Sequence, residues 1–508
     1  MSLSVTCGSC DTIFRVKTEY IGKRGRCPRC QNIILISGDA PAEQIIPVET
    51  NKPIPEESAT SDHASTPEEF SKEDEAPKVH RLSVGESPDV LMREILQAFH
   101  GEIQPVKRTL TFHIGMMILA GLMVLMPLIY LGMIVEIGYL IFYHATVNLD
   151  SITHSHSILA LIFLYVAPLI AGVVLLFFMV KPLFASRSRS QKLRTLEFGQ
   201  EPLLFALVTR IAKAVGAPEP TRINVDCQPN ASAGFGSIFG KELVLTIGLP
   251  LVAGLSIQQL AGVIAHELGH FAQGTAMRLS YIVRSVNLWF ARVVYERDDW
   301  DESLARGCEA ENRFALILLL AMFCIWLTRC ILRVFMVITH ALSSFMLRQM
   351  EYDADRYEAR LAGSKTFGKT QRRLLLLGLA TNGAHLMAGR SWFLTGKLPD
   401  DLSSLILGIS EGISKKEFRK IEKQEEKTTT GFFDSHPAHT ERLANARKEN
   451  AEGLFQLEGP ATDLFREFPK MSRAVTLDFY REVLGRRVKK DKLVPTAAFL
   501  ENTEHPME

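Results

Sequence analysis

The chain has almost no net charge and no apolar leader at its start. Its 57 Lys and Arg residues face 56 Asp and Glu residues, which leaves a formal net charge of +1 over 508 residues. Nothing in this balance draws the protein to nucleic acid. The first thirty residues carry four cysteines and several charges where a secretory signal needs an apolar run, so we expect no cleavable signal peptide. Apolar residues make up 47% of the chain, which indicates a protein partly in the membrane.

The chain also lacks the dense cysteine pattern of a disulfide scaffold. Four of its eight cysteines are scattered singly, which is typical of a reducing compartment. The other four form two CxxC pairs with sixteen residues between them: Cys7, Cys10, Cys27 and Cys30. This spacing is that of a closed four-cysteine zinc site, so we predict a structural Zn²⁺ in a small β ribbon at residues 1–36. The metal would hold together a module too small to fold alone. A binding module for a partner or regulator is the alternative.

Residues 263–270 contain an HExxH pattern. Residues four apart lie on one face of a helix, so His266 and His270 can hold one metal ion together. Glu267 lies beside them, where its carboxylate can take a proton from a water molecule that the metal activates. The alternative is an ordinary amphipathic helix with two surface histidines.

A second segment, near residue 350, favours the metal site. Catalytic zinc needs three protein ligands and an open position, and two histidines with a glutamate are a known set. Glu351 would supply the third ligand. Asp355, one helical turn later, could accept the free ring N–H of a zinc-bound histidine. A solvated helix face in a charged segment is the alternative for these two residues.

These motifs, followed by the His-Pro and Glu-Arg pairs within residues 434–442, resemble the membrane zinc metalloproteases of the HtpX and CAAX prenyl endopeptidase family. The resemblance covers roughly residues 195–450. It implies a catalytic part for His436, whose imidazole could stabilise the oxyanion of the reaction. It also implies that residues 230–232 (Asn230, Ala231 and Ser232) bind substrate as an added β-strand. A structural hairpin without a substrate role is the alternative for that segment.

Two long uncharged stretches, residues 114–135 and 158–180, predict membrane-spanning helices. The loop expected between them, residues 136–157, has no Lys or Arg, whereas basic residues flank the pair on both sides. The positive-inside rule therefore places both ends of this hairpin in the cytoplasm.

A third apolar region, residues 279–347, leaves two topologies open. Since His270 and Glu351 must meet at one zinc, the chain crosses the membrane an even number of times between them. Two crossings would place the acidic loop at 298–311 outside, and no crossing would leave a hairpin in the membrane surface. In either case, one helix from residue 314 through 355 would carry Glu351 to the site.

We predict a mainly α integral-membrane protein, with an α+β zincin-like catalytic domain on transmembrane helices and a small β zinc ribbon. Residues 37–88, rich in Pro, Glu, Ser and Thr and poor in aromatics, are expected to form a disordered acidic linker. The parts are the ribbon (1–36), this linker (37–88), an N-terminal helix with two transmembrane helices (89–194), the metalloprotease domain with a membrane hairpin near 279–347 (195–450), and a C-terminal helical extension (451–508).

The predicted function is that of an integral-membrane zinc endopeptidase, with one catalytic and one structural Zn²⁺. Its N-terminus and catalytic site would lie on the cytoplasmic side of a bacterial inner membrane. Its partners would be the lipid bilayer and protein or peptide substrates, mainly membrane proteins in quality control or processing, and no nucleic acid. The alternative is a non-catalytic membrane scaffold that recruits partners through its zinc ribbon, although the presence of Glu267 favours the enzyme. A zinc hydrolase acting on non-peptide bonds is a second alternative.

Overall fold

The computed structural model divides the chain into two compact units, residues Met1–Asp74 and Glu75–Glu508. The structure describes residues 2–6, 13–17, 24–26, 33–35, 80–81, 87–106, 109–153, 158–184, 193–235, 242–272, 275–295, 315–431, 434, 436–485 and 488–504.

The first unit contains two small β-hairpins. Strand β1 (Ser2–Thr6) pairs antiparallel with β2 (Ile13–Lys17), and β3 (Arg24–Arg26) pairs antiparallel with β4 (Ile33–Leu35). The short apolar runs of the predicted ribbon therefore do form strands. The four ribbon cysteines and most of the linker lie outside the described residues, so the structural zinc stays a prediction.

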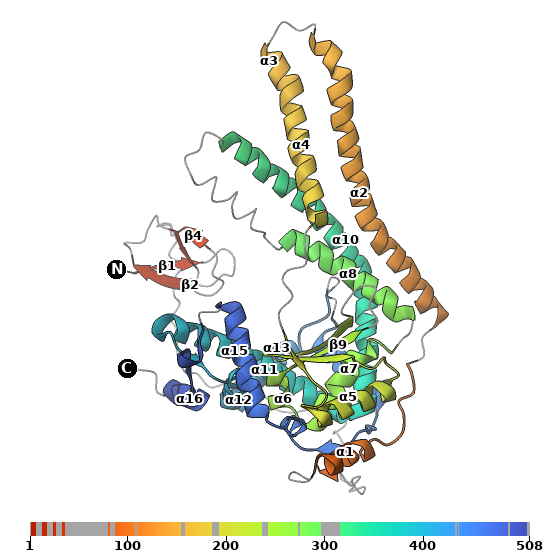
Figure 1. The fold of residues 1–508 in the computed structure, drawn as a ribbon, viewed down its shortest axis with the longest axis vertical. Coiled ribbons are helices and arrows are strands. Elements are labelled where there is room, and N and C mark those ends of the chain that lie inside the picture. The colour runs from red at the N-terminus through yellow and green to blue at the C-terminus, as the bar shows by residue number, and fades with distance from the viewer. Residues whose placement is uncertain are drawn as a thin grey trace, which may run out of the picture. The chain divides into compact units, whose positions relative to one another are not determined.

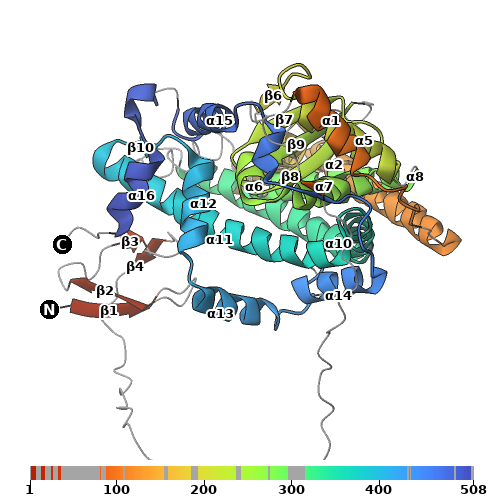
Figure 2. The same cartoon turned by 90° about the horizontal axis from the view of Figure 1, so that it is seen from below.

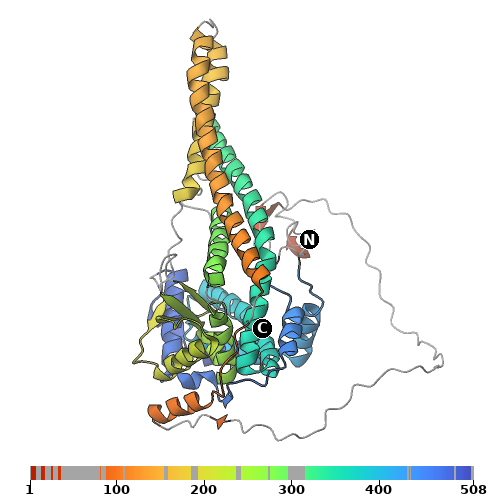
Figure 3. The same ribbon diagram turned by 90° about the vertical axis from the view of Figure 1, so that its right-hand side faces the viewer.

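Among the described residues, three helical segments of the second unit are long and apolar enough to cross a membrane. They are α2 (Leu110–Thr153), α4 (Ala167–Val180) with the short helical turns before it (α3, Ile158–Leu161, and a π-helical turn, Ile162–Val166), and α10 (Ala315–Ala362). The candidate spans are Leu110–Val147, Ile162–Phe184 and Leu319–Ala362. These helices lie side by side and extend away from the part of the unit that contains the sheet (Figures 1 and 3). Large apolar side chains such as Leu128, Phe163 and Phe323 are more than half exposed on them, as a lipid-facing surface requires.

The prediction of a loop at residues 136–157 is wrong for residues 136–153, because α2 continues to Thr153. The charge of Glu136 predicts the end of the membrane span. A single carboxylate limits how much of the helix can lie in the hydrocarbon core, but it does not interrupt the helical hydrogen bonds. Pro127 is likewise inside the helix.

Helix α8 (Thr275–Tyr295) packs between α2 and α10, through a small core that includes Met123, Val283 and Leu347. It is not among the candidate spans. The 48 residues of α10 form one continuous helix about 72 Å long, at 1.5 Å per residue. The prediction of a single helix from the third apolar region to Glu351 and Asp355 is therefore confirmed.

A four-stranded mixed sheet lies beside α7 (Ile257–Gly269), the helix that contains the HExxH pattern. Its order is β6 (Arg194–Leu196), β7 (Arg222–Asp226), β9 (Leu243–Gly248) and β8 (Ala231–Phe235). Strands β7 and β9 are parallel, and the other neighbours are antiparallel. Strands β8 and β9 therefore form an antiparallel pair before α7, with β8 at the edge of the sheet.

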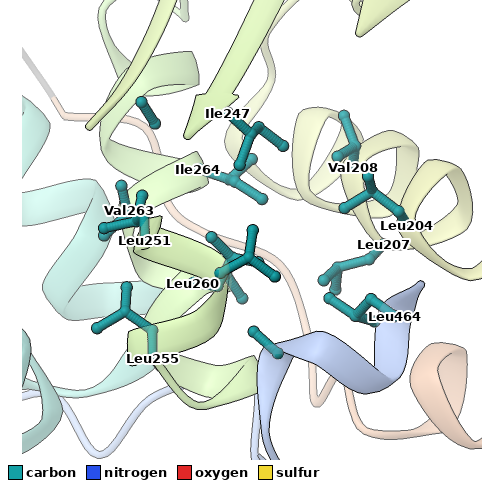
Figure 4. Packing of buried hydrophobic residues seen from close by; sticks show 14 of the residues in the cluster. Leu204, Leu207, Val208, Ile247, Leu251, Leu255, Leu260, Val263, Ile264 and Leu464 are labelled. Carbon is teal, nitrogen blue, oxygen red and sulfur yellow. The ribbon is translucent and has the colours of Figure 1, made fainter. Parts of the chain in front are cut away.

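The main core joins this sheet to helices α5 (Pro202–Val215), α6 (Leu249–Gly254) and α7 (Ile257–Gly269). Figure 4 shows Leu204, Leu207 and Val208 of α5 facing the α7 side chains Leu260 and Ile264, with Ile247 of β9 above them. Residues four apart on α7 are buried here, which fixes the rotation of that helix about its axis.

The other described α-helices of this unit lie around the sheet and α7, or on the helices that cover them (Figure 2). They are α1 (Pro88–Gln97), α11 (Ser364–Thr395), α12 (Leu402–Gly412), α13 (Lys415–Glu425), α14 (His439–Glu449), α15 (Phe468–Val483) and α16 (Thr496–Glu504).

Both ends of the second unit join its core directly. In the C-terminal extension, Phe455, Leu457 and Leu464 are buried in the main core. Strand β11 (Leu457–Glu458) pairs with β5 (His80–Arg81), which falls inside the stretch expected to be linker. A second short pair joins β10 (Leu398–Pro399) to β12 (Leu493–Val494).

Candidate active site

Helix α7 begins at a capping box, in which the side chain of Ser256 accepts from the backbone N–H of Gln259 and the Gln259 side chain accepts from the Ser256 N–H. This arrangement satisfies free amides at the helix start. With Leu260, Ile264 and Leu268 turned into the core, the opposite side of α7 faces α10.

Two glycines allow α7 and α10 to approach closely. A Cβ atom at Gly262 would lie 2.9 Å from the Cβ of Ala362, and one at Gly269 would lie 2.9 Å from the Tyr357 ring. Because any side chain at these positions would separate the helices, the glycines set the distance between the two halves of the site.

The structure brings His266, His270 and Glu351 together. Nε2 of His266 lies 3.6 Å from Oε2 of Glu351, and Nε2 of His270 lies 3.7 Å from Oε1 of the same carboxylate. All three residues are at most 9% exposed, and their donor atoms lie within 4.8 Å of one another. Two donors on one tetrahedral zinc, each about 2.0–2.1 Å from the metal, lie about 3.4 Å apart. The residues therefore fit a zinc ion by donor type and by spacing.

Asp355 lies behind the ligands with no exposed surface. Its Oδ1 is 3.2 Å from Nδ1 of His266, on the opposite side of the ring from Nε2. Arg442 of α14 binds the same carboxylate through two nitrogens, Nε at 3.0 Å from Oδ2 and Nη2 at 2.6 Å from Oδ1. Asp355 is therefore held as an anion beside the ring of His266.

The protonation of the two histidines differs because their neighbours differ. Burial would lower the pKa of His266, but the carboxylates of Asp355 and Glu351 outweigh it and raise that pKa to about 10. Burial lowers the pKa of His270 well below its ordinary value. The second imidazole is thus ready to bind a metal, whereas the first must release a proton to do so.

Glu267 is half-buried next to the ligands, and burial raises the pKa of its carboxyl group. The backbone N–H of Ala233 in β8 lies close enough to this carboxylate to lower its pKa slightly. The edge strand and the acid/base candidate are therefore neighbours.

The register of β8 changes which of its residues can hold a substrate strand. Gly248 donates its N–H to the carbonyl of Asn230, so residues 230, 232 and 234 face β9 with their backbone groups. Ala231, Ala233 and Phe235 therefore direct theirs away from β9. Of the three predicted substrate-binding residues, Ala231 has free backbone groups for an added strand, and Asn230 and Ser232 do not. Which residues of an edge strand direct their backbone groups outward depends on the register of that strand with its neighbour, and the sequence does not show this register.

His436 also lies at the site. Its Nδ1 is 3.3 Å from Oε2 of Glu351, and its side chain is 71% exposed. The segment before it is tied to α10, because Arg348 donates to the carbonyl of Asp434 at 2.9 Å. Pro437 is buried and anchors the other side.

Three polar residues lie at the site for which the sequence predicts no role. Arg442 was visible only within the Glu-Arg pair of the family resemblance. Glu358, 2% exposed, lies 3.7 Å from Nδ1 of His266, and its position one turn after Asp355 on the same helix could have indicated it. Arg284 of α8 contacts Glu351, and nothing local to its apolar segment pointed there.

Residues 200–450 match the model of peptidase family M48. This match supports an M48 peptidase domain in that part of the chain. The protease HtpX of Acinetobacter baylyi is 28% identical over 181 residues, which cover 34% of this chain and 56% of that protein. The protease HtpX of Idiomarina loihiensis is 26% identical over 198 residues, which cover 37% of this chain and 62% of that protein. The chain thus spans less than two thirds of the length of either curated relative. The M48 match contains the HExxH helix, Glu351, Asp355 and His436.

Proposed function

We propose that this protein is an integral-membrane zinc metalloendopeptidase. The observation that carries the proposal is the meeting of His266, His270 and Glu351 from two helices, with Glu267 beside them, inside a segment similar to M48 peptidases. The apolar helices support a place in the membrane. By the charges that flank the first two spans, the site would face the cytoplasm of a bacterial inner membrane.

His266, His270 and Glu351 would hold the zinc. When bound, the metal supplies a Lewis acid that polarises the scissile carbonyl and makes an attacking water more acidic. Glu267 accepts the proton of that water and passes it to the leaving amine. Its raised pKa suits the first step, because a more basic carboxylate takes the proton of the water more readily.

The other residues position the substrate and the ligands. Asp355, held by Arg442, keeps the ring of His266 oriented. A substrate strand beside β8 would pair with the outward backbone groups of Ala231 and the outward carbonyl of Ala233, which brings its own backbone to Glu267. His436 would donate to the oxyanion. The substrates we propose are proteins or peptides near the bilayer, with quality control or processing as the biological role.

Glu267→Gln tests the function directly. We expect the purified variant to keep about one zinc at this site and to lose peptide cleavage, because Glu267 is a base and not a ligand. His266→Ala should lose both zinc and cleavage. Metal content by mass spectrometry, together with cleavage of a fluorogenic peptide library, distinguishes the cases. Undiminished cleavage by Glu267→Gln would contradict the proposed mechanism, and an inactive zinc-loaded wild-type protein would favour the scaffold.

A further inference from the structure

Helix α8 brings a positive charge to the candidate zinc site. Nη2 of Arg284 lies 3.3 Å from Oε1 of Glu351, and the Arg284 side chain is 43% exposed. Glu351 is buried, so the guanidinium contacts it with one edge and leaves the remainder accessible. A second anion can therefore reach Arg284 from solvent.

Zinc binding would leave this arginine without a matching anion in the cluster. The two positive charges of the ion are balanced by the carboxylates of Glu351 and Glu267. Asp355 is already paired with Arg442. Glu358 lies on the Nδ1 side of His266, and it has no contact with Arg284 among the described residues. The positive charge of Arg284 is then available to a substrate.

Arg284 also lies where a substrate strand along β8 would pass. The outward N–H of Ala233 lies near the carboxylate of Glu267, and the scissile bond would lie beside that carboxylate. Two residues later the Phe235 ring contacts Tyr281 of α8, with ring centroids 5.9 Å apart. Tyr281 and Arg284 are three residues apart, so they share one face of α8. A side chain next to the scissile bond can therefore lie against Tyr281 with its end at Arg284.

We propose that Arg284 forms a subsite that takes an acidic side chain, Asp or Glu, of the substrate residue beside the scissile bond. The planar guanidinium can bind a carboxylate through two parallel N–H groups, which a neutral amide cannot match. This inference rests on the proposed peptidase function and adds a substrate preference to it.

Matched peptides test the preference. Each pair carries Glu or Gln at one of the two positions on either side of the scissile bond and is otherwise identical. With wild-type protein, we expect kcat/KM to be about tenfold higher for the Glu peptide at one position, the gain typical of one hydrogen bond to a charged group. In Arg284→Gln the ratio should fall to about one, and in Arg284→Lys part of the preference should remain. Arg292→Gln is the control, since Arg292 is a second arginine of α8, two helical turns further on. It should keep the wild-type ratio.

A binding measurement separates this inference from the proposed function. In a Glu267→Gln background, fluorescence anisotropy gives the Kd of each labelled peptide without cleavage, and zinc content is measured on the same samples. The Glu peptide should bind more tightly than the Gln peptide only while residue 284 is basic. An equal ratio in wild type and Arg284→Gln, in both assays, would overturn the subsite, as would the same loss of preference in Arg292→Gln. Should no peptide be cleaved by the wild type, the peptidase proposal fails, while the anisotropy still decides whether Arg284 selects acidic peptides.

Discussion

The contacts of Asp355 connect it to the proposed metal site, although it is not one of the proposed ligands. It has no exposed surface, and its two oxygens are shared between the ring of His266 and the guanidinium of Arg442. Because the arginine keeps the carboxylate charged, the histidine ring next to it is favoured in its protonated form when no metal competes. The charged carboxylate of Asp355 would thus both orient the ring of His266 and stabilise the proton that competes with zinc for that ring.

This competition predicts that zinc affinity depends strongly on pH. The pKa of His266 is raised to about 10, so below that pH zinc must displace a proton from it. We expect the apparent zinc affinity to rise with pH, by about tenfold per unit for this one group. Zinc competition with a coloured chelator at pH 6 to 9 measures the slope.

Asp355→Asn is the comparison variant for this experiment. It removes the main group that raises the pKa of His266, so the slope should be flatter, while zinc binds about 10- to 100-fold more weakly at the upper end of the range. Parallel slopes in the two proteins would show that Asp355 does not control the protonation of His266.

His436 is exposed and yet contacts a buried ligand, an arrangement suited to a group that meets the substrate. We predict that His436→Ala lowers kcat at least tenfold with zinc retained and KM little changed, because loss of one oxyanion donor typically costs about 10²–10³ in rate. Steady-state kinetics with metal analysis checks this. His439, on the first turn of α14, is the matched control, and His439→Ala should keep kcat. A normal kcat in His436→Ala would assign the residue a structural role.

At the scale of elements, the packing of α7 against α10 sets the distances between the residues of the site. A Cβ at position 262 would meet the Cβ of Ala362 at 2.9 Å and the Cγ of Glu358 at 3.2 Å. The Cβ of Ala362 is fixed by the backbone of α10 and cannot rotate away. The helices must then move apart, and the histidines of one move away from Glu351 of the other.

Gly262→Ala therefore has two opposite effects on the free energy of unfolding. Helix propensity favours alanine by about 1 kcal/mol, whereas overpacking costs about 1–3 kcal/mol. We expect the second to win, with a lower Tm and weaker zinc binding. Gly378→Ala in α11 is the matched control, because nothing lies within 4 Å of its added Cβ, and it should raise Tm slightly. Thermal unfolding in detergent measures both, and equal shifts in the two variants would contradict the close packing.

At the scale of the whole molecule, the arrangement across the membrane follows from charges that flank the spans. We predict that a membrane-impermeant thiol reagent, applied from outside to a protein with Cys308 replaced by serine, labels a cysteine introduced at Asp150 and none introduced at Gln200 or Lys448. The chain without an added cysteine is the control. Labelling at position 200 would show that the orientation is opposite to the one predicted. The native Cys308 adds a further test, since its labelling from outside requires that α8 and α10 both cross the membrane.

The sequence by itself determined the features that depend on neighbours along the chain. The helical spacing of His266 and His270, the position of Glu267, and the apolar spans all follow from local composition and from the 3.6-residue turn of a helix. The positions of Glu351 and Asp355 beside the two histidines were also predicted, because both residues belong to one short helical motif. The end of α2 was not, since a single charge limits membrane depth and leaves helical hydrogen bonding intact.

Tertiary structure alone decided how these elements meet. Arg284 and Glu351 are 67 positions apart in the chain, and Arg442 and Asp355 are 87 apart, so no local pattern links either pair. The outward amides of β8 depend on its register with β9, which a shift of one residue would reverse. Packing of α7 on α10 through small residues turns separate motifs into one site. The sequence specifies the chemistry of each group, and long-range packing specifies which groups act together.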